Sequence, residues 1–341
     1  MSEFGLIAAS DACTVVAEYE PSPRVGEGWQ SEAALEDALV ARLEAQGYEP
    51  VAIPDEAALV ANLRRQLEAL NGIVFSDGEW ERFFGQCVAK ANEGIPEKTA
   101  RLQRSPVEVL RRDDGSFRNV TLLDRRRIHN NRLQVMRQYA EAGGAHASRY
   151  DVTILVNGLP MAQIELKRRG VALREAFNQI NRYQRESYWA GWGLFEYVQL
   201  FVISNGTHTK YYSNTTRWRA IQEREGRRAS RGKKCCDSFE FTSFWADGRN
   251  RAIMDLEDFA RTFFAKHTFL SVLTRYCVLT AETEPSLLVM RPYQIAATEA
   301  ILRRIATSSA YRQMGTPAAG GYVWHTTGSG KTLTSFKTAQ L

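Results

Sequence analysis

An aspartate, a glutamate and a lysine stand on one largely apolar segment, YDVTILVNGLPMAQIELKRRG, at residues 150–170. Asp151 lies near its start, and Glu165 and Lys167 lie two residues apart near its end. The apolar runs on either side of the central Asn-Gly pair predict a β-hairpin that is mostly buried. Two carboxylates that converge repel each other unless a cation lies between them, and oxygen ligands with room for water suit Mg²⁺. The segment therefore predicts a metal site.

Such a site has the parts for metal-dependent phosphodiester hydrolysis. Mg²⁺ held by Asp151 and Glu165 would lower the pKa of a bound water and neutralise charge on a scissile phosphate. Lys167 would orient the nucleophile or stabilise the pentacovalent centre. Glu32 or Glu36, on a predicted helix upstream, could add a further ligand. The alternative is a structural hairpin with one solvent-exposed polar face and an ordinary Glu/Lys pair.

The register of the hairpin decides between these two interpretations, because a shift by one residue moves a side chain to the other face. A two-residue loop pairs Val156 with Leu159 and sets Asp151 on the wrong face. A three-residue loop pairs Val156 with Pro160 and sets Asp151 opposite Glu165. We therefore predict the three-residue loop, with a bulge at the turn glycine.

A helix predicted over residues 171–188 follows the hairpin and carries Gln179 and Tyr183 one turn apart on one face. Their amide and phenol groups could hold a DNA phosphate or the attacking water. Arg182, beside them, could contact a phosphate. The alternative is a routine helix surface, and only the position directly after Glu-Leu-Lys makes the pattern informative.

A second motif, GYVWHTTGSGKT at residues 321–332, predicts a phosphate-binding loop made of a short buried strand, a Gly-rich turn and a helix. Its glycines would let backbone N–H groups wrap the phosphates, Lys331 would reach the β and γ phosphates, and Thr332 would offer its hydroxyl to Mg²⁺. His325 stands where the usual pattern has its first glycine. Upstream, the Gln of RPYQ could read an adenine edge. The predicted ATP-binding residues are Gln294, Gly328, Ser329, Gly330, Lys331 and Thr332.

Composition places these motifs in an ordinary globular protein of 341 residues, 44% of them hydrophobic. No apolar run is long enough to span a membrane, and no basic leader opens the chain. Five cysteines without metal-binding spacing fit a reducing cytoplasm. Basic residues gather at 101–149 and 217–234, which suits a polyanion, although solvated loops would look the same.

A coarse pass along the chain predicts a mixed α/β fold. We expect a nuclease-type domain over residues 1–270, a connector over 271–289, and the start of a second domain over 290–341. The expected helices are at 31–48, 55–95, 171–188 and 256–267, and the expected strands outside the hairpin are at 119–124, 197–206, 209–213 and 239–244.

Taken together, Asp151-x13-Glu165-Leu-Lys167, Gln179-x3-Tyr183, RPYQ and WHTTGSGKT resemble the endonuclease and motor (R) subunit of type I restriction-modification enzymes, particularly type IC. The resemblance covers most of the chain. It implies a PD-(D/E)xK nuclease domain with a mixed sheet flanked by helices, followed by the start of a RecA-like, superfamily-two translocase. It also implies Mg²⁺ and ATP as cofactors, double-stranded DNA as substrate, and methyltransferase and specificity subunits as partners.

Two departures from the family pattern matter. The basic stretch at 217–234 is longer than expected, and the chain ends at Leu341, soon after Lys331. We therefore expect no acidic Walker B box and no ATP hydrolysis or translocation by this chain alone. Two rival hypotheses remain: an inactive remnant that binds DNA or a partner, and a repair nuclease of the RecB type, which shares Glu-x-Lys and Gln-x3-Tyr.

Overall fold

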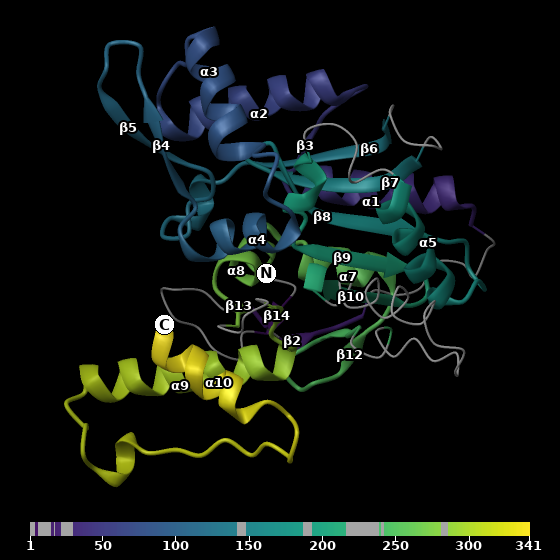
Figure 1. The fold of residues 1–341 in the computed structure, drawn as a ribbon. Helices are drawn as coiled ribbons and strands as arrows, with labels where there is room; N and C mark the ends of the chain where they lie inside the picture. Colours follow the sequence, from purple (N-terminus) through teal and green to yellow (C-terminus); the bar gives the residue numbers. More distant parts are fainter. Residues whose placement is uncertain are drawn as a thin grey trace, which may run out of the picture.

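A mixed six-stranded sheet forms the centre of the protein (Figure 1). The computed structural model describes residues 4–5, 15–16, 18–21, 30–141, 148–186, 193–215, 239, 242–280 and 286–341, without the side chains of 4–5, 140–141, 148–149 and 181–186. The strand order is β10-β9-β8-β7-β6-β3, in which β8 runs parallel to β9 and β3 parallel to β6, and the other pairs are antiparallel. The strands are β3 Glu49–Pro50, β6 Leu133–Glu141, β7 Ser148–Val156, β8 Leu159–Leu166, β9 Leu200–Ser204 and β10 Thr209–Ser213. This confirms the mixed α/β class.

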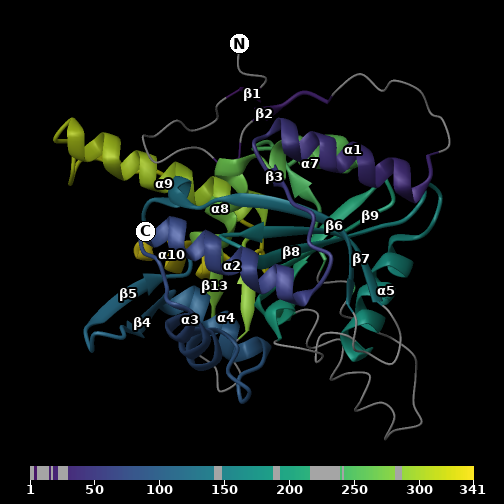
Figure 2. The ribbon, with the colours of Figure 1, turned by 90° about the horizontal axis from the view of Figure 1, so that it is seen from above.

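Helices cover both faces of the sheet, so β8 and β9 are buried along their whole lengths. Figure 2 shows α1 and α7 on one face and α4 and α5 on the other. The first helix begins where the sequence predicts, because the Ser31 side chain accepts a hydrogen bond from the Ala34 N–H at 3.1 Å. The helices on the two faces are α1 Glu32–Ala45, α7 Leu256–Phe263, α4 Ile95–Arg104 and α5 Leu173–Glu186.

The hairpin of β7 and β8 turns through two residues, not three, so the predicted loop is wrong. Val156 pairs with Leu159, and the two turn residues have positive φ, 53° at Asn157 and 82° at Gly158. Gly158 also packs closely on the helix α2 (Glu56–Asn71), because a Cβ there would lie 2.7 Å from the Leu63 Cα. The turn glycine thus serves a tight turn and a close approach.

A bulge lies further along the same hairpin. Leu155 pairs with Pro160, whereas Ile154 pairs with Ala162, so Met161 is the extra residue on β8. The bulge was predicted at the turn glycine and is found at Met161.

Several other predicted elements are shifted or divided. The helix predicted over 55–95 is broken into two helices and a π-helical turn, and the strand at 119–124 lies slightly earlier, in a separate hairpin of β4 and β5. Of the strand predicted at 239–244, residues 240–241 lie outside the described part of the chain, Ser243 forms a single β-bridge with Tyr211, and β11 begins just after it. The strand β6 was not predicted at all. These elements are α2 Glu56–Asn71, α3 Asp77–Phe83, the π-helical turn η1 Phe84–Val88, β4 Val107–Arg111, β5 Phe117–Thr121, and β11 Trp245–Ala246, which pairs with β12 Ala252–Ile253.

The segment expected to be a connector, 271–289, has regular structure. The helix α8 continues into it, and two short strands within it pair with each other. Leu287 and the adjoining Met290 are fully buried. The elements are α8 Lys266–Thr274, β13 Cys277–Leu279 and β14 Leu287–Val289.

The C-terminal region consists of two packed helices, α9 Pro292–Ala310 and α10 Lys331–Gln340, joined by the Gly-rich motif. The short buried strand predicted before the loop is not formed: Tyr322 is 90% exposed and Trp324 88% exposed. A buried strand of this kind belongs to the interior of a sheet, and none of the described strands pairs with this segment. Among the described residues, no helix is both long and apolar enough to cross a membrane.

Candidate active site

The candidate site lies at the end of β8, where the hairpin meets the first turn of α1. Glu165 and Lys167 lie two residues apart, so their side chains leave the same face of the chain. The Lys167 Nζ donates to Glu165 Oε1 at 3.0 Å and to the Leu166 carbonyl at 3.0 Å. The lysine is therefore held directly against one oxygen of the carboxylate.

The bulge brings Asp151 to the same place. Because Val152 pairs with Ile164, continuing the register sets Asp151 level with Glu165, as the sequence analysis required. The Asp151 Oδ2 accepts the backbone N–H of Leu166 at 2.8 Å. The two predicted carboxylates and the lysine therefore do come together, through a bulge at a different position from the one expected.

Burial keeps both carboxyl groups from ionising easily. Glu165 is fully buried, and burial together with the charge of Asp151 raises its pKa to about 8, despite the opposing effect of Lys167. Burial also raises the pKa of Asp151 to about 6, although the Leu166 N–H lowers it. Two carboxyl groups that are costly to ionise side by side would be stabilised in the charged form by a divalent cation.

One oxygen of Glu165 is positioned to bind such a cation. The Glu165 Oε2 is buried and has no hydrogen-bond partner among the described residues. A buried carboxylate oxygen without a donor is costly, and a divalent cation would satisfy it. Within the described ranges no cluster of three or more His, Cys, Asp or Glu side chains has metal-binding geometry, so a cation here would have two carboxylates and would complete its shell with water or substrate.

The first turns of α1 add negative charge at the rim of this site. Glu32 Oε1 accepts the Arg168 N–H at 3.2 Å, and its Oε2 lies 3.9 Å from the Lys167 Nζ. Glu36 is buried and accepts from the Gln138 Nε2 at 3.0 Å. The charges of both glutamates contribute to the raised pKa of Asp151.

Gln138 is a residue that the sequence analysis missed. It lies on β6 opposite Asp151, because the pairs on either side are Arg137 with Val152 and Tyr139 with Tyr150. Its φ of 54° interrupts the strand pairing at this position. Its side chain donates a hydrogen bond to Glu36 on α1. No sequence signal marks it, because glutamine has no special preference for that conformation.

The helix predicted to support the site is present as α5, which packs beside β8 and β9. Its side chains at Ala176, Phe177 and Ile180 are buried. Gln179 is half-buried, and the side chains of Arg182 and Tyr183 lie outside the described part of the structure. The basic stretch at 217–234 also lies outside it.

The predicted nucleotide loop has the backbone shape that a phosphate site needs. Gly328 and Gly330 have φ values of 78° and 81°, and α10 begins directly after them at Lys331. Here the Lys331 Nζ donates to the Thr326 carbonyl at 3.0 Å. The loop and helix are as predicted, although the preceding strand is not.

The Gln294 side chain, predicted to read an adenine edge, is hydrogen-bonded to the Gly-rich loop. Its Nε2 donates to the Ser329 carbonyl at 2.7 Å, and its Oε1 accepts the Arg291 N–H at 2.8 Å. The hydroxyl of Tyr293 donates to the same Ser329 carbonyl at 3.0 Å. A side chain on Gly330 would collide with the Gln294 amide, since a Cβ there would lie 2.3 Å from Nε2. Gln294 therefore fixes the loop to the start of α9.

Comparisons with known proteins agree with this arrangement. Residues 29–220 match the family profile described as Type I restriction enzyme R protein N terminus, and residues 293–341 match the profile of the SWI2/SNF2 ATPase. The EcoprrI type I restriction enzyme endonuclease subunit of Escherichia coli is 47% identical over 303 residues, which are 89% of this chain and 91% of that protein. A type I restriction enzyme endonuclease subunit of Staphylococcus saprophyticus is 40% identical over 318 residues, 92% of this chain but 30% of that protein.

The mixed sheet, the helicase-like loop and these matches define a restriction-system protein with an ATPase-like C-terminal region. The chain belongs to the family of type I restriction enzyme R proteins and corresponds to the N-terminal region of their endonuclease subunit. It spans most of the E. coli relative and about a third of the staphylococcal one. This membership favours a restriction enzyme over a RecB-type repair nuclease.

Proposed function

We propose that this chain carries the Mg²⁺-dependent nuclease domain of a type I restriction enzyme, built on a PD-(D/E)xK site that cleaves double-stranded DNA. The observation that carries the proposal is the convergence of Asp151, Glu165 and Lys167 at the end of β8, with one buried carboxylate oxygen left without a donor. Three charged groups that converge on such an oxygen fit a metal site better than an isolated structural Glu/Lys pair.

Asp151 and Glu165 are the residues that would hold the metal ion. Bound there, it would lower the pKa of a water molecule and offset the charge on the scissile phosphate. The raised pKa values of both carboxyl groups support this assignment, because a pair of acids that is costly to ionise alone is stabilised by a divalent cation. Glu32 and Glu36 add negative potential from α1 and could accept hydrogen bonds from metal-bound water.

Lys167 is the proposed electrophilic residue. Its side chain is 12% exposed, and its ammonium group is hydrogen-bonded to Glu165 and to the Leu166 carbonyl, so its position is fixed before substrate arrives. A fixed positive charge can stabilise the pentacovalent phosphorus or orient the attacking water without further reorganisation. Gln179, Arg182 and Tyr183 on α5 are proposed to hold the DNA backbone or that water.

The Gly-rich loop is proposed to bind ATP, with Lys331 on the β and γ phosphates and Thr332 on the accompanying Mg²⁺. The left-handed glycines and the match to the SWI2/SNF2 ATPase family support this. In the complete enzyme, ATP would drive translocation along DNA before cleavage. We further propose assembly with the methyltransferase and specificity subunits of the same system, acting in the cytoplasm on unmethylated foreign DNA.

Cleavage of a supercoiled plasmid tests the nuclease assignment. The chain would be incubated with Mg²⁺ or Mn²⁺, with and without ATP and the partner subunits, and compared with Glu165→Gln. We expect nicked or linear DNA from the wild type only. Equal activity of both proteins under the same conditions would assign the cleavage to another site or to a contaminant.

A further inference from the structure

An unpaired strand edge lies on the hairpin of β4 and β5, away from the carboxylates (Figure 1). Two backbone bonds fix the pattern of this hairpin: the Leu122 N–H donates to the Pro106 carbonyl at 2.8 Å, and the Arg112 N–H to the Ser116 carbonyl at 2.8 Å. In an antiparallel pair, residues that exchange hydrogen bonds alternate with residues whose backbone groups point outward. The outward-pointing residues on β4 are therefore Val107, Val109 and Arg111.

The two outer edges of the hairpin differ at the end that carries Thr121 and in the groove that follows β4. On β5, the outward backbone groups of Thr121 are bound by the Asn71 side chain of α2, through an N–H donated at 2.7 Å and a carbonyl that accepts at 2.9 Å. On β4, none of the three outward residues has a backbone hydrogen-bond partner among the described residues, and all three are exposed. Such an edge can pair with another strand.

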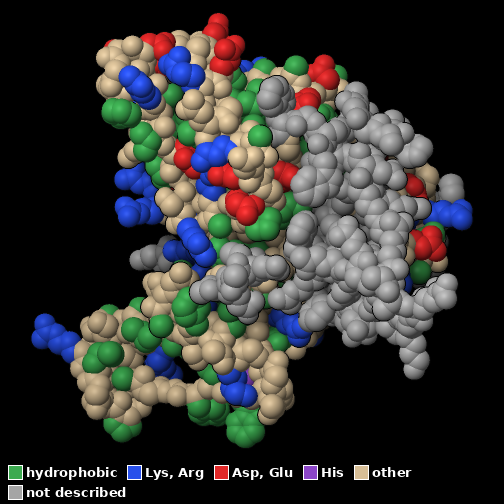
Figure 3. Space-filling view, viewed as in Figure 1, with side chains coloured by type: hydrophobic (Ala, Val, Ile, Leu, Met, Phe, Trp, Pro, Cys, Tyr) green, Lys and Arg blue, Asp and Glu red, His purple; other side chains and the backbone are tan. Residues whose placement is uncertain are grey.

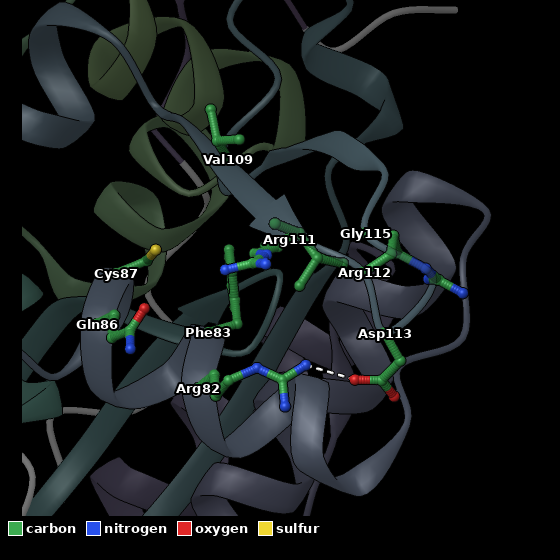
Figure 4. A pocket seen from close by; sticks show the side chains of 10 residues that line it. Arg82, Phe83, Gln86, Cys87, Val109, Arg111, Arg112, Asp113 and Gly115 are labelled. Carbon is green, nitrogen blue, oxygen red and sulfur yellow. Dashed lines mark hydrogen bonds and ion pairs between the residues drawn. The ribbon is translucent and has the colours of Figure 1, made fainter.

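A groove runs along this open edge. It has a volume of about 410 Å³ and lies between β4 with its following turn on one side and α3 with η1 on the other. Figure 4 shows Val109 and Arg111 on the strand, with Gln86 and Cys87 on the helix that faces them. The groove therefore offers both open backbone groups and an opposing wall of side chains.

The charge of the groove is positive because one arginine is not neutralised. Arg82 is paired with Asp113, and Arg112 with Glu79 at 3.1 Å. Arg111 has no acidic partner in the described ranges. In Figure 3, Lys and Arg side chains gather along the side of the molecule where β4 and β5 lie. The groove thus presents one free guanidinium next to the strand edge.

We propose that this groove binds an extended acidic segment of a partner protein, which adds to β4 as a further strand and places a carboxylate against Arg111. Backbone N–H and carbonyl groups of a peptide complement the open edge, and alternate side chains would rest on Val107 and Val109, which are 39% and 56% exposed. A carboxylate matches the geometry of the guanidinium. Duplex DNA offers phosphates to Arg111 but no backbone that pairs with the edge, so the peptide accounts for more of the observations.

Selection from a displayed library of random peptides on the whole chain tests this proposal. Val109→Pro removes an outward N–H without touching the bonds between β4 and β5, and Asn119→Pro makes the same change at the paired position on the other edge. We expect acidic, extended peptides to be enriched on the wild type. Their affinity should fall roughly tenfold or more with Val109→Pro and with Arg111→Glu, and should be kept by Asn119→Pro.

A second measurement protects the test against misfolding of the proline variants. Selected peptides methylated at alternate backbone nitrogens should lose binding to the wild-type chain, since the edge needs their hydrogen bonds. The proposal is overturned if no acidic peptide is enriched, or if enriched peptides ignore Arg111→Glu and backbone methylation. It is also overturned if a short fluorescent duplex binds in a manner that depends on Arg111 while no peptide does, which would assign this surface to DNA.

Discussion

The Lys167 Nζ lies 3.0 Å from Glu165 Oε1, while Oε2 of the same carboxylate is buried without a hydrogen-bond partner among the described residues. The lysine thus occupies one oxygen and leaves the other for a cation. This division separates the two roles: Glu165 holds the metal, and Lys167 acts on the substrate. Substitutions at the two positions should therefore have different effects.

Replacing Lys167 should abolish cleavage without abolishing metal binding. Lys167→Ala removes the positive charge near the phosphate, and we expect at least a ~100-fold lower cleavage rate. Mn²⁺ affinity should be unchanged or higher, because the carboxylates lose a competing cation. Lys167→Arg should not restore activity, since the planar guanidinium cannot replace a compact ammonium group at this distance. Plasmid nicking and Mn²⁺ titration of the same preparations give both readouts, and joint loss of both would contradict the division of roles.

Glu165→Gln should stabilise the metal-free protein, and more so at higher pH. The pKa of Glu165 is raised by folding to about 8, so the folded state binds more protons than the unfolded state between its ordinary pKa and pH 8. Its ionisation therefore costs stability as pH rises through this range. The amide avoids that cost, and we expect a gain of roughly 1–3 kcal/mol at pH 8 and little at pH 5. Thermal melts in a chelator across this range measure the difference, and a pH-independent effect would show that burial does not hinder ionisation.

Gly158→Ala should destabilise the hairpin strongly. The substitution forces a positive φ on alanine and drives its Cβ to within 2.7 Å of the Leu63 Cα, so we expect a loss of about 2–4 kcal/mol. Gly115→Ala is the matched control: its φ is 85° but nothing lies within 4 Å of a Cβ there, and about 1 kcal/mol should be lost. Urea denaturation compares them. Equal losses would mean that the approach of α2 does not constrain the turn.

Gln294→Glu should weaken nucleotide binding by loosening the loop. Glutamate keeps the oxygen that accepts the Arg291 N–H but loses the N–H donated to the Ser329 carbonyl, and it adds repulsion of that carbonyl. We expect the Kd for a fluorescent ATP analogue to rise roughly tenfold. Lys331→Ala should have at least as large an effect, through lost phosphate contact. An unchanged Kd for Gln294→Glu would show that the loop keeps its shape without this bond.

The sequence was enough to predict the hairpin, the two carboxylates with their lysine, and the loop before α10, because turn residues, strand alternation and glycine patterns are local signals. It did not predict how Asp151 reaches the level of Glu165. The bulge at Met161 depends on packing across the sheet, and no residue type marks it. Gln138 was missed for a similar reason, because no residue type marks its positive φ.

The segment before the Gly-rich loop was wrongly predicted to be a buried strand, because the prediction used its apolar residues alone. Tyr322 and Trp324 are apolar enough for a strand, yet they stay exposed because no described strand lies beside them. An apolar run thus predicts burial only when its neighbours are known. Whether Gln179 and Tyr183 contact DNA, and where the domain boundaries fall, remain predictions.

Calorimetric titration of Mn²⁺ in the presence of a short DNA duplex tests the central claim most directly. Wild type, Glu165→Gln and Asp151→Asn would be compared at pH 6 and pH 8. We expect wild type to bind more tightly at pH 8 than at pH 6, because the pKa values of about 6 and about 8 leave more protons for the metal to displace at pH 6. Proton release on binding should accordingly be larger at pH 6, and both variants should lose binding. If all three proteins behave alike at both pH values, the charges on the hairpin are structural and the chain does not hold a nuclease metal at this site.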